Sequence, residues 1–158
     1  MLKIGKLTLP SPVMLAPMAG ITDLPFRLIA RSFGCAFAFV EMISARALVY
    51  QSQKTGKMLS TVPEDRPLGV QLLGNDPEIL KKALGKLREH RFDLLDFNAA
   101  CPANKVTGKG KGASLLKEPA RLRDLLKVIV ADADVPVTVK IRAGWDEATA
   151  RTSSRTFG

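Results

Sequence analysis

The sequence predicts an α/β protein in which parallel β-strands alternate with helices. Short apolar segments alternate with longer amphipathic segments five times along the 158 residues, and the connections between the apolar segments are too long for β-hairpins. Connections of this kind join parallel strands in right-handed βαβ units. A doubly wound open sheet and a (β/α)8 barrel are both built from such units.

Polar residues near the ends of the predicted strands favour the barrel. Met18, Glu41, Gln71, Asn98 and Lys140 each stand at or near the C-terminal end of an otherwise apolar segment. Barrel enzymes collect their chemistry at this end of the sheet. A complete barrel needs eight strands and typically about 250 residues. The sequence therefore predicts an incomplete (β/α)8 TIM barrel with about the first five βα units.

The first elements are predicted from apolar runs, prolines and caps. Residues 2–9 alternate weakly and predict a small hairpin, and residues 13–18 form a short apolar strand. Asp23 is a suitable N-cap, Pro25 falls in the first turn and Gly34 is a suitable C-terminal stop, so a helix is expected between them.

Two more strands frame the next helix. Residues 36–42 predict a strand, and Ser44 then caps a helix over residues 45–59. Residues 62–67 form a turn, and residues 68–73 predict the third strand.

The C-terminal half repeats the pattern. An Asn-Asp-Pro start opens a helix over residues 75–90, and residues 93–97 form a short buried strand. After a loop rich in Gly and Lys, helical spacing returns over residues 118–131. Residues 136–141 are rich in β-branched side chains and predict the fifth strand.

A thiol follows the fourth strand directly. The strand ends on Asn98, and Cys101 comes three residues later, locked to Pro102. Proline fixes its own φ angle and biases the preceding residue towards an extended conformation, so the thiol is held just past the strand end. The residues alone leave two interpretations open: a reactive group, or a buried cysteine acting as a small hydrophobe.

Charge and composition narrow the function classes. Lys and Arg exceed Asp and Glu by a net charge of +9, which favours a polyanionic partner, nucleic acid ahead of a membrane surface, or else serves solubility. The sequence contains no apolar run near the roughly 18 residues that span a bilayer and no signal-peptide h-region, so a cytoplasmic protein is expected. Cys35 and Cys101 are expected to be free thiols, and no metal site is predicted.

Several segments, in order, resemble the tRNA-dihydrouridine synthase family, FMN enzymes that reduce uridine in tRNA. The likeness covers nearly all of residues 7–148. It is carried by APMAGITDLPFR at 16–27, Glu41-Met42, Gln71 in GVQLLG, DFNAACP at 96–102, KVTGKGKGASLLKEP at 105–119 and VTVKIRAGW at 137–145.

The resemblance implies a cofactor, a partner and a set of site residues. Cys101 is implied to be the proton donor, opposite a reduced FMN that NADPH regenerates, and tRNA is the implied partner. Lys140, on a β-branched strand, is expected to face a buried partner: an anionic flavin, or else Glu41 or Asp96 in a salt bridge. The implied FMN contacts are Pro17, Met18, Ala19, Gln71 and Lys140, and the implied substrate contacts are Asn98, Lys105 and Arg142.

The sequence departs from the family at two places. Ala100 stands where many members have Gly before the cysteine, which affects only a backbone angle. Residues 1–150 read as the N-terminal portion of an FMN-binding barrel, whereas the polar tail 151–158 does not resemble what should follow. A truncated reading frame, a frame-shifted one, or a fragment of a longer protein would explain such a tail.

Two other functions stay open at this point. One is a related FMN barrel that acts on a free pyrimidine, like dihydroorotate dehydrogenase. The other is an inactive remnant that binds RNA through its basic surface. For the isolated 158 residues we expect weak FMN binding and poor solubility, because an open parallel sheet exposes two edges. The sequence predicts no oligomeric state.

Overall fold

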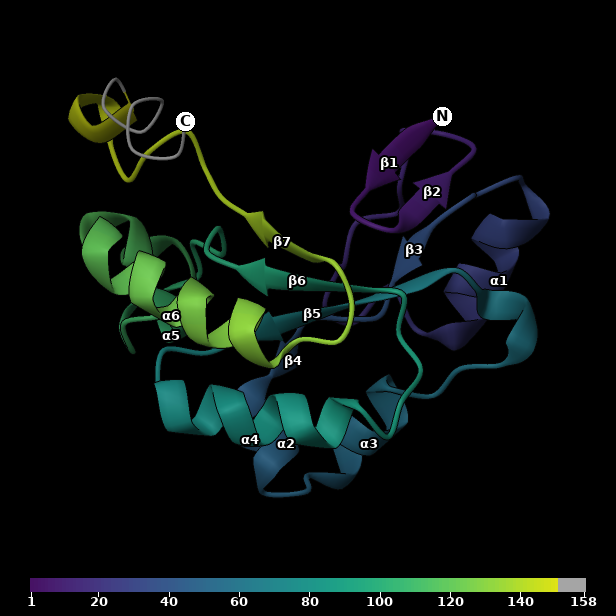
Figure 1. The fold of residues 1–158 in the computed structure, drawn as a ribbon, viewed down its shortest axis with the longest axis horizontal. Coiled ribbons are helices and arrows are strands. Elements are labelled where there is room, and N and C mark those ends of the chain that lie inside the picture. The colour runs from purple at the N-terminus through teal and green to yellow at the C-terminus, as the bar shows by residue number, and fades with distance from the viewer. Residues whose placement is uncertain (151–158) are drawn as a thin grey trace.

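The computed structural model describes residues 1–150 and contains one parallel sheet flanked by helices (Figure 1). The strands run in the order β3-β5-β6-β7, and β4 also pairs with β5. All of these pairings are parallel, as predicted. The strands are β3 (Ala38–Phe39), β4 (Ile43–Ser44), β5 (Leu68–Leu73), β6 (Leu94–Asn98) and β7 (Val137–Lys140).

The first two predicted barrel strands are shorter than expected. Residues 13–18 make only a parallel bridge between Leu15 and Ala38, held by hydrogen bonds from Leu15 N to Phe37 O (2.9 Å) and from Phe39 N to Leu15 O (3.2 Å). The predicted strand 36–42 is interrupted, since β3 and β4 pair with opposite ends of β5. The described residues thus occupy five strand positions of a barrel: the Leu15 segment, β3 with β4, β5, β6 and β7.

Helices connect these positions. They are α1 (Leu24–Ser32), α2 (Ala45–Val49), α3 (Gln53–Met58), α4 (Pro77–Leu87), α5 (Asn104–Thr107) and α6 (Pro119–Asp132), with 3-10 turns η1 (Pro63–Asp65) and η2 (Gly112–Lys117). The predicted caps are confirmed: Asp23 accepts from Phe26 N, and Asp76 accepts from Ile79 N. Proline in the first turn of both helices costs nothing, because those amides have no partner within the helix.

Two predicted boundaries are wrong. The helix expected over residues 45–59 is split into α2 and α3, because Gln51 adopts a left-handed φ of 54° and interrupts the hydrogen-bond ladder. The loop expected after Cys101 contains α5 and η2. No glycine or proline lies within four residues of Gln51, so local sequence signals miss this break. Around α5 the opposite holds, because Pro102 and the glycines from Gly108 onward favour a loop and conceal the two short helices.

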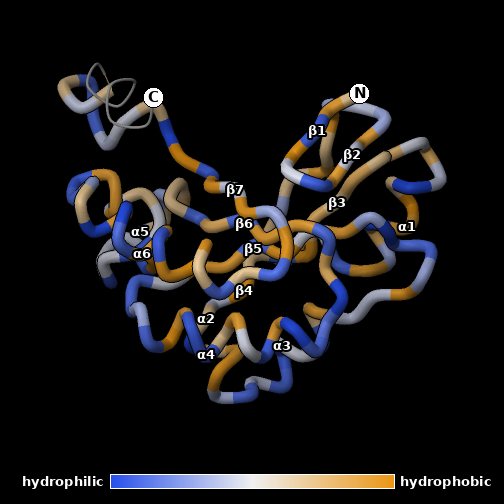
Figure 2. The backbone as a smooth tube through the Cα atoms, viewed as in Figure 1, coloured by the Kyte–Doolittle hydropathy of each residue, from blue (hydrophilic) through white to orange (hydrophobic). Residues whose placement is uncertain are grey.

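The two faces of the sheet are covered differently. Val70, Leu72, Leu95 and Phe97 pack in the main core with apolar residues of α4 and α6, and Figure 2 shows the hydrophobic segments concentrated along the central strands. The opposite face carries Phe37, Phe39 and Leu94 near the start of the strands, packed against Leu9. Leu9 belongs to an antiparallel hairpin, β1 (Leu2–Ile4) with β2 (Leu7–Leu9), which confirms the prediction for residues 2–9.

None of the helices in residues 1–150 combines the length and apolar character needed to cross a bilayer.

Candidate functional site

Three polar side chains form a row across the sheet near the C-terminal ends of the strands. The strand register pairs Gln71 on β5 with Asp96 on β6, and Asp96 with Thr138 on β7. Gln71 Nε2 donates to Asp96 Oδ2 at 2.6 Å, and Thr138 Oγ1 donates to Asp96 Oδ1 at 2.7 Å. Gln71 and Asp96 are buried. Paired residues on neighbouring strands point to the same face, so this row lines the side of the sheet that becomes the interior of a barrel.

Asn98 links this row to the cysteine. Its Nδ2 donates to Gln71 Oε1 at 2.7 Å. Its Oδ1 accepts from the backbone amides of Ala100 at 3.1 Å and Cys101 at 2.9 Å. Because an ionised carboxylate can only accept hydrogen bonds, Gln71 must turn its Nε2 towards Asp96 and its Oε1 towards Asn98, and this orientation fixes the amide of Asn98. A directed chain of hydrogen bonds therefore runs from Asp96 to the backbone of Cys101.

The loop that carries Cys101 is held from its other side by a glycine. The carbonyl of Cys101 accepts from Ala113 N at 3.0 Å. Gly112 has φ +59°, and a Cβ at this position would lie 2.6 Å from Cys101 O. Only glycine allows this close approach without strain. Cys101 is half-buried, and both it and Cys35 are free thiols, as predicted.

A turn after the first strand position lies next to Glu41. The Glu41 carboxylate accepts a hydrogen bond from Gly20 N. The Thr22 hydroxyl accepts from Met18 N at 3.0 Å. The predicted flavin-facing residues Pro17, Met18 and Ala19 all belong to this turn, with Pro17 and Met18 half-buried and Ala19 exposed.

The charges at the strand ends are only partly balanced. Burial raises the pKa of Asp96 above its ordinary value, while hydrogen bonds from Gln71 and Thr138 and the positive charge of Lys140 oppose that rise. Lys140 pairs with Asn98 in the strand register and therefore shares its face. Within residues 1–150, the Lys140 ammonium forms no ion pair with Glu41 or Asp96 and is exposed.

The remaining predicted substrate contacts lie outside the hydrogen-bonded row. Lys105 is an exposed residue of α5, and Arg142 is exposed just after β7. Further basic residues gather near α5: burial lowers the pKa of Lys111, and the charges of Lys109 and Arg46 lower it further. Such mutual repulsion is relieved by a bound anion.

Sequence reasoning missed Asp96 and Thr138 as members of the site. Both precede a predicted site residue by two positions in the same strand, Asn98 in β6 and Lys140 in β7. Side chains alternate between the two faces of a strand. A residue two positions before a predicted site residue therefore shares its face, and this spacing could have predicted both residues.

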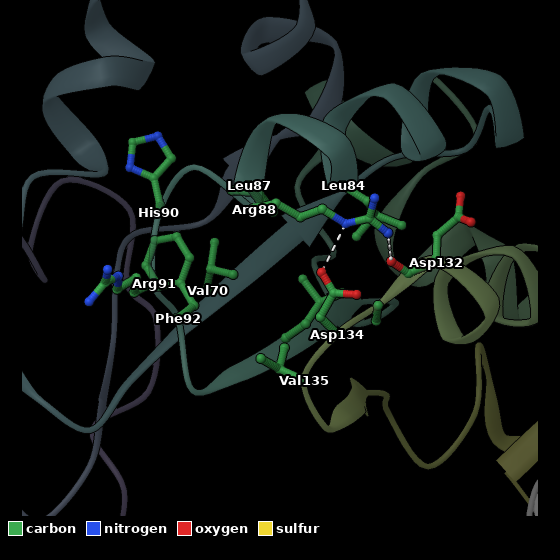
Figure 3. A pocket seen from close by; sticks show the side chains of 12 residues that line it. Val70, Leu84, Leu87, Arg88, His90, Arg91, Phe92, Asp132, Asp134 and Val135 are labelled. Atoms are coloured by element: carbon green, nitrogen blue, oxygen red, sulfur yellow. Dashed lines mark hydrogen bonds and ion pairs between the residues drawn. The ribbon is translucent and has the colours of Figure 1, made fainter.

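A cavity of about 260 Å³ lies elsewhere, beneath α4 and α6 (Figure 3). Its lining includes Val70, Leu87, Phe92 and Leu95. At its mouth, Arg88 Nε pairs with Asp134 at 2.9 Å and Arg88 Nη2 donates to Asp132 O at 2.8 Å. None of the row residues lines it, so it is separate from the candidate site. In the described part of the chain, no cluster of three His, Cys, Asp or Glu side chains could hold a metal.

Fold and site define a partial α/β barrel with a polar rim and a positioned thiol. Residues 14–155 match the family model "Dihydrouridine synthase (Dus)". The chain belongs to the dihydrouridine synthase family, which confirms the resemblance seen in the sequence. The match includes residues 151–155 of the predicted tail. The tail lies outside the described residues, and its boundary and origin stay predictions.

Curated relatives agree with the family. The chain is 41% identical over 144 residues to tRNA-dihydrouridine synthase B of Pseudomonas aeruginosa, covering 91% of this chain and 43% of that protein. It is 39% identical over 147 residues to probable tRNA-dihydrouridine synthase 1 of a Synechocystis species, covering 92% of this chain and 41% of that protein. The chain thus spans less than half the length of the curated relatives it matches.

The residues present fit the ring system of FMN better than its phosphate. The exposed ammonium of Lys140 and the buried amide of Gln71 lie on the same face of the sheet and carry donors suited to the polar edge of a flavin ring. Eight-stranded barrels frequently bind phosphate with the loops after strands seven and eight, whereas the described residues supply five strand positions.

Proposed function

We propose that residues 1–150 are the N-terminal portion of an FMN-binding barrel that reduces uridine in tRNA to 5,6-dihydrouridine, with NADPH as the source of electrons. The observation that carries the proposal is the hydrogen-bond chain from Asp96 to Cys101 in a chain of this family. The reaction belongs to the complete barrel, because the relatives are more than twice as long as the matched region. A cytoplasmic location follows from the tRNA substrate.

Cys101 is the proposed acid. When bound and reduced, FMN would provide the hydride for one carbon of the uracil 5,6 double bond. The Cys101 thiol gives its proton to the other carbon from the opposite side of the base, and the thiolate is reprotonated from solvent. Asn98 supports this role because its Oδ1 holds the backbone of Cys101, and a fixed acid loses less entropy in reaching the substrate.

Lys140 and Gln71 are the proposed contacts to the flavin. A cation at Lys140 stabilises negative charge on the ring, and its exposure leaves it free to do so. Pro17, Met18 and Ala19 form an adjacent wall against one side of the ring. Asn98 uses its Oδ1 for the cysteine loop, so we assign it a positioning role beside any contact to the base.

Lys105 and Arg142 are the proposed contacts to tRNA. Both are exposed, and Lys105 lies four residues after Cys101, next to the basic residues Lys109 and Lys111. Phosphate contacts of this kind give salt-dependent affinity without reading the base sequence.

Deleting the gene for the chain tests the proposal. Dihydrouridine in total tRNA, measured by mass spectrometry, is expected to fall and to return with the wild-type gene. When the Cys101→Ala gene replaces the wild-type gene, the rate of dihydrouridine formation is expected to be at least 100-fold lower. A positioned acid contributes a factor of about 10² to 10⁴ in rate. Unchanged dihydrouridine would remove the proposal. In that case, altered free pyrimidine pools would favour an enzyme like dihydroorotate dehydrogenase, and salt-sensitive tRNA binding without turnover would favour an RNA-binding remnant.

A further inference from the structure

The cavity beneath α4 and α6 has an apolar interior. Its apolar lining is supplied by the two central strands, by α4 and by the connections that precede β6 and β7. These residues are Val70, Leu84, Leu87, Phe92, Leu95, Ala133 and Val135, and the first five of them are buried. An apolar molecule of matching size gains dispersion contacts with such a lining on several sides.

At about 260 Å³, the cavity is large enough for a bicyclic aromatic ring. Apolar protein cavities of about 150 Å³ bind benzene, so the larger volume has room for about ten non-hydrogen atoms. The ring of Phe92 lines one side of the cavity, next to Val70, as Figure 3 shows. Aromatic rings favour offset-stacked or edge-to-face contacts with another ring. The volume and the Phe92 ring therefore favour a flat aromatic ligand.

The charges around the mouth of the cavity balance one another. Arg88 and Arg91 line the cavity together with Asp132 and Asp134, and His90, counted as neutral at pH 7, also lines it. Equal numbers of positive and negative side chains favour neither a cation nor an anion. A charged ligand would also lose its water shell on entering apolar surroundings. The lining therefore selects a neutral ligand.

The ion pair of Arg88 with Asp134 lies at the mouth and is easily separated. It joins the C-cap of α4 to the connection before β7, at 2.9 Å. The two side chains are 54% and 67% exposed, and an exposed ion pair contributes little to stability. Opening the mouth therefore costs little. The carboxylate of Asp134 is also an acceptor for an N–H or O–H group of the ligand.

We propose that this cavity binds a small, neutral, aromatic molecule of the size of indole, which enters between Arg88 and Asp134. The site lies at the opposite end of the sheet from the polar row. Residues 90–92 precede β6 and residues 133–135 precede β7, whereas Asn98 ends β6. The proposal is therefore independent of the proposed reaction, and a ligand here leaves the row and the Cys101 loop free.

Titration of the 158-residue chain with 5-fluoroindole, followed by fluorine NMR, tests the proposal. We expect saturable binding. Val135→Phe places a ring in the cavity and is expected to raise the Kd at least tenfold. Val130→Phe makes the same change on α6, at a position that is 60% exposed and outside the cavity lining, and is expected to leave the Kd unchanged. The anion 5-fluoroindole-2-carboxylate is expected to bind at least tenfold more weakly.

Intermolecular NOEs locate the ligand in the wild-type chain without any substitution. We expect contacts from the ring protons of 5-fluoroindole to the methyl groups of Leu87 and Leu95, and none to Ile29, which is 59% exposed on α1. Circular dichroism shows whether Val135→Phe is folded, and the NOEs decide if it is not. The absence of saturable binding, equal Kd values for folded Val135→Phe and Val130→Phe, equal or tighter binding of the carboxylate, or NOEs to Ile29 in place of Leu87 and Leu95 would each overturn the proposal.

Discussion

Asp65 and Asp96 are both buried carboxylates, but the groups around them differ in charge. Asp65 accepts from Arg27 at 2.7 Å and faces Arg31 Nε at 3.6 Å. Within residues 1–150, Asp96 accepts only from the neutral donors Gln71 and Thr138. Burial raises the pKa of Asp96.

The difference separates a structural role from a proposed functional one. Arg27 also donates to the carbonyls of Thr22 (2.8 Å) and Ser60 (2.9 Å), so the charged cluster ties α1 to the segment before β5. Two atoms of this cluster, Arg31 Nε and Asp65 Oδ1, have no hydrogen-bond partner within residues 1–150, but both are buried and face each other at 3.6 Å. The Asp96 row instead shares its face of the sheet with the exposed Lys140 ammonium, and Asn98 links it to the backbone of the half-buried Cys101.

The largest expected effect is on the Asp65 cluster. Arg27→Met leaves a fully buried carboxylate whose remaining neighbours are the Thr61 hydroxyl and Arg31 Nε, and breaking a buried pair costs about 3 to 5 kcal/mol. Urea denaturation of the 158-residue chain measures the change. Arg123→Ala breaks an exposed pair with Asp124 and is expected to cost less than about 0.5 kcal/mol. A loss below about 1 kcal/mol for Arg27→Met, the level of surface pairs, would contradict the structural role.

A smaller effect is expected from removing the acceptor in the row. Asp96→Ala leaves the donors of Gln71 and Thr138 unsatisfied, which costs about 1 to 3 kcal/mol. It also releases the chain of hydrogen bonds that holds Cys101, so alkylation of this thiol should become faster in a Cys35→Ser background. Asp96→Asn keeps an acceptor for Gln71, so its stability and its rate of Cys101 alkylation should both lie closer to those of wild type. Identical behaviour of the two variants would show that the acceptor is unimportant.

The smallest expected effect is the pH dependence due to Asp96. Because burial raises its pKa above 3.8 in the folded chain, the folded state retains a proton that the unfolded state releases. The free energy of unfolding therefore falls as pH rises from about 4 through the pKa of Asp96 in the folded state. Above that pKa, Asp96 causes no further change. The stability of wild type relative to Asp96→Asn should fall over this interval, as followed by urea midpoints at several pH values. A difference that grows with pH would mean that the pKa is lowered instead.

How much the sequence predicts depends on whether the signal is local. Residues 68–73 form β5 with the predicted bounds, because a buried parallel strand is apolar throughout except at Gln71. The caps at Asp23 and Asp76 are equally local and were correct. Gln71, Asn98 and Cys101 were predicted as site residues, and the structure joins them.

The features that sequence reasoning missed depend on distant partners. Arg27 and Asp65 are 38 positions apart, so nothing local shows that α1 buries its arginine and exposes its phenylalanines. Asp96 and Thr138 are 42 positions apart and meet only through the register of β6 and β7. Register follows from the assembled sheet.

Flavin affinity at Lys140 tests the central claim most directly, namely that this open rim is one part of a flavin site. FMN is titrated into the 158-residue chain, into its Lys140→Gln variant and into the matched variant Lys127→Gln, which changes an exposed lysine of α6. We predict that Lys140→Gln raises the Kd at least tenfold, about 1.4 kcal/mol, while Lys127→Gln leaves it unchanged. Equal affinities for the two variants would contradict the account.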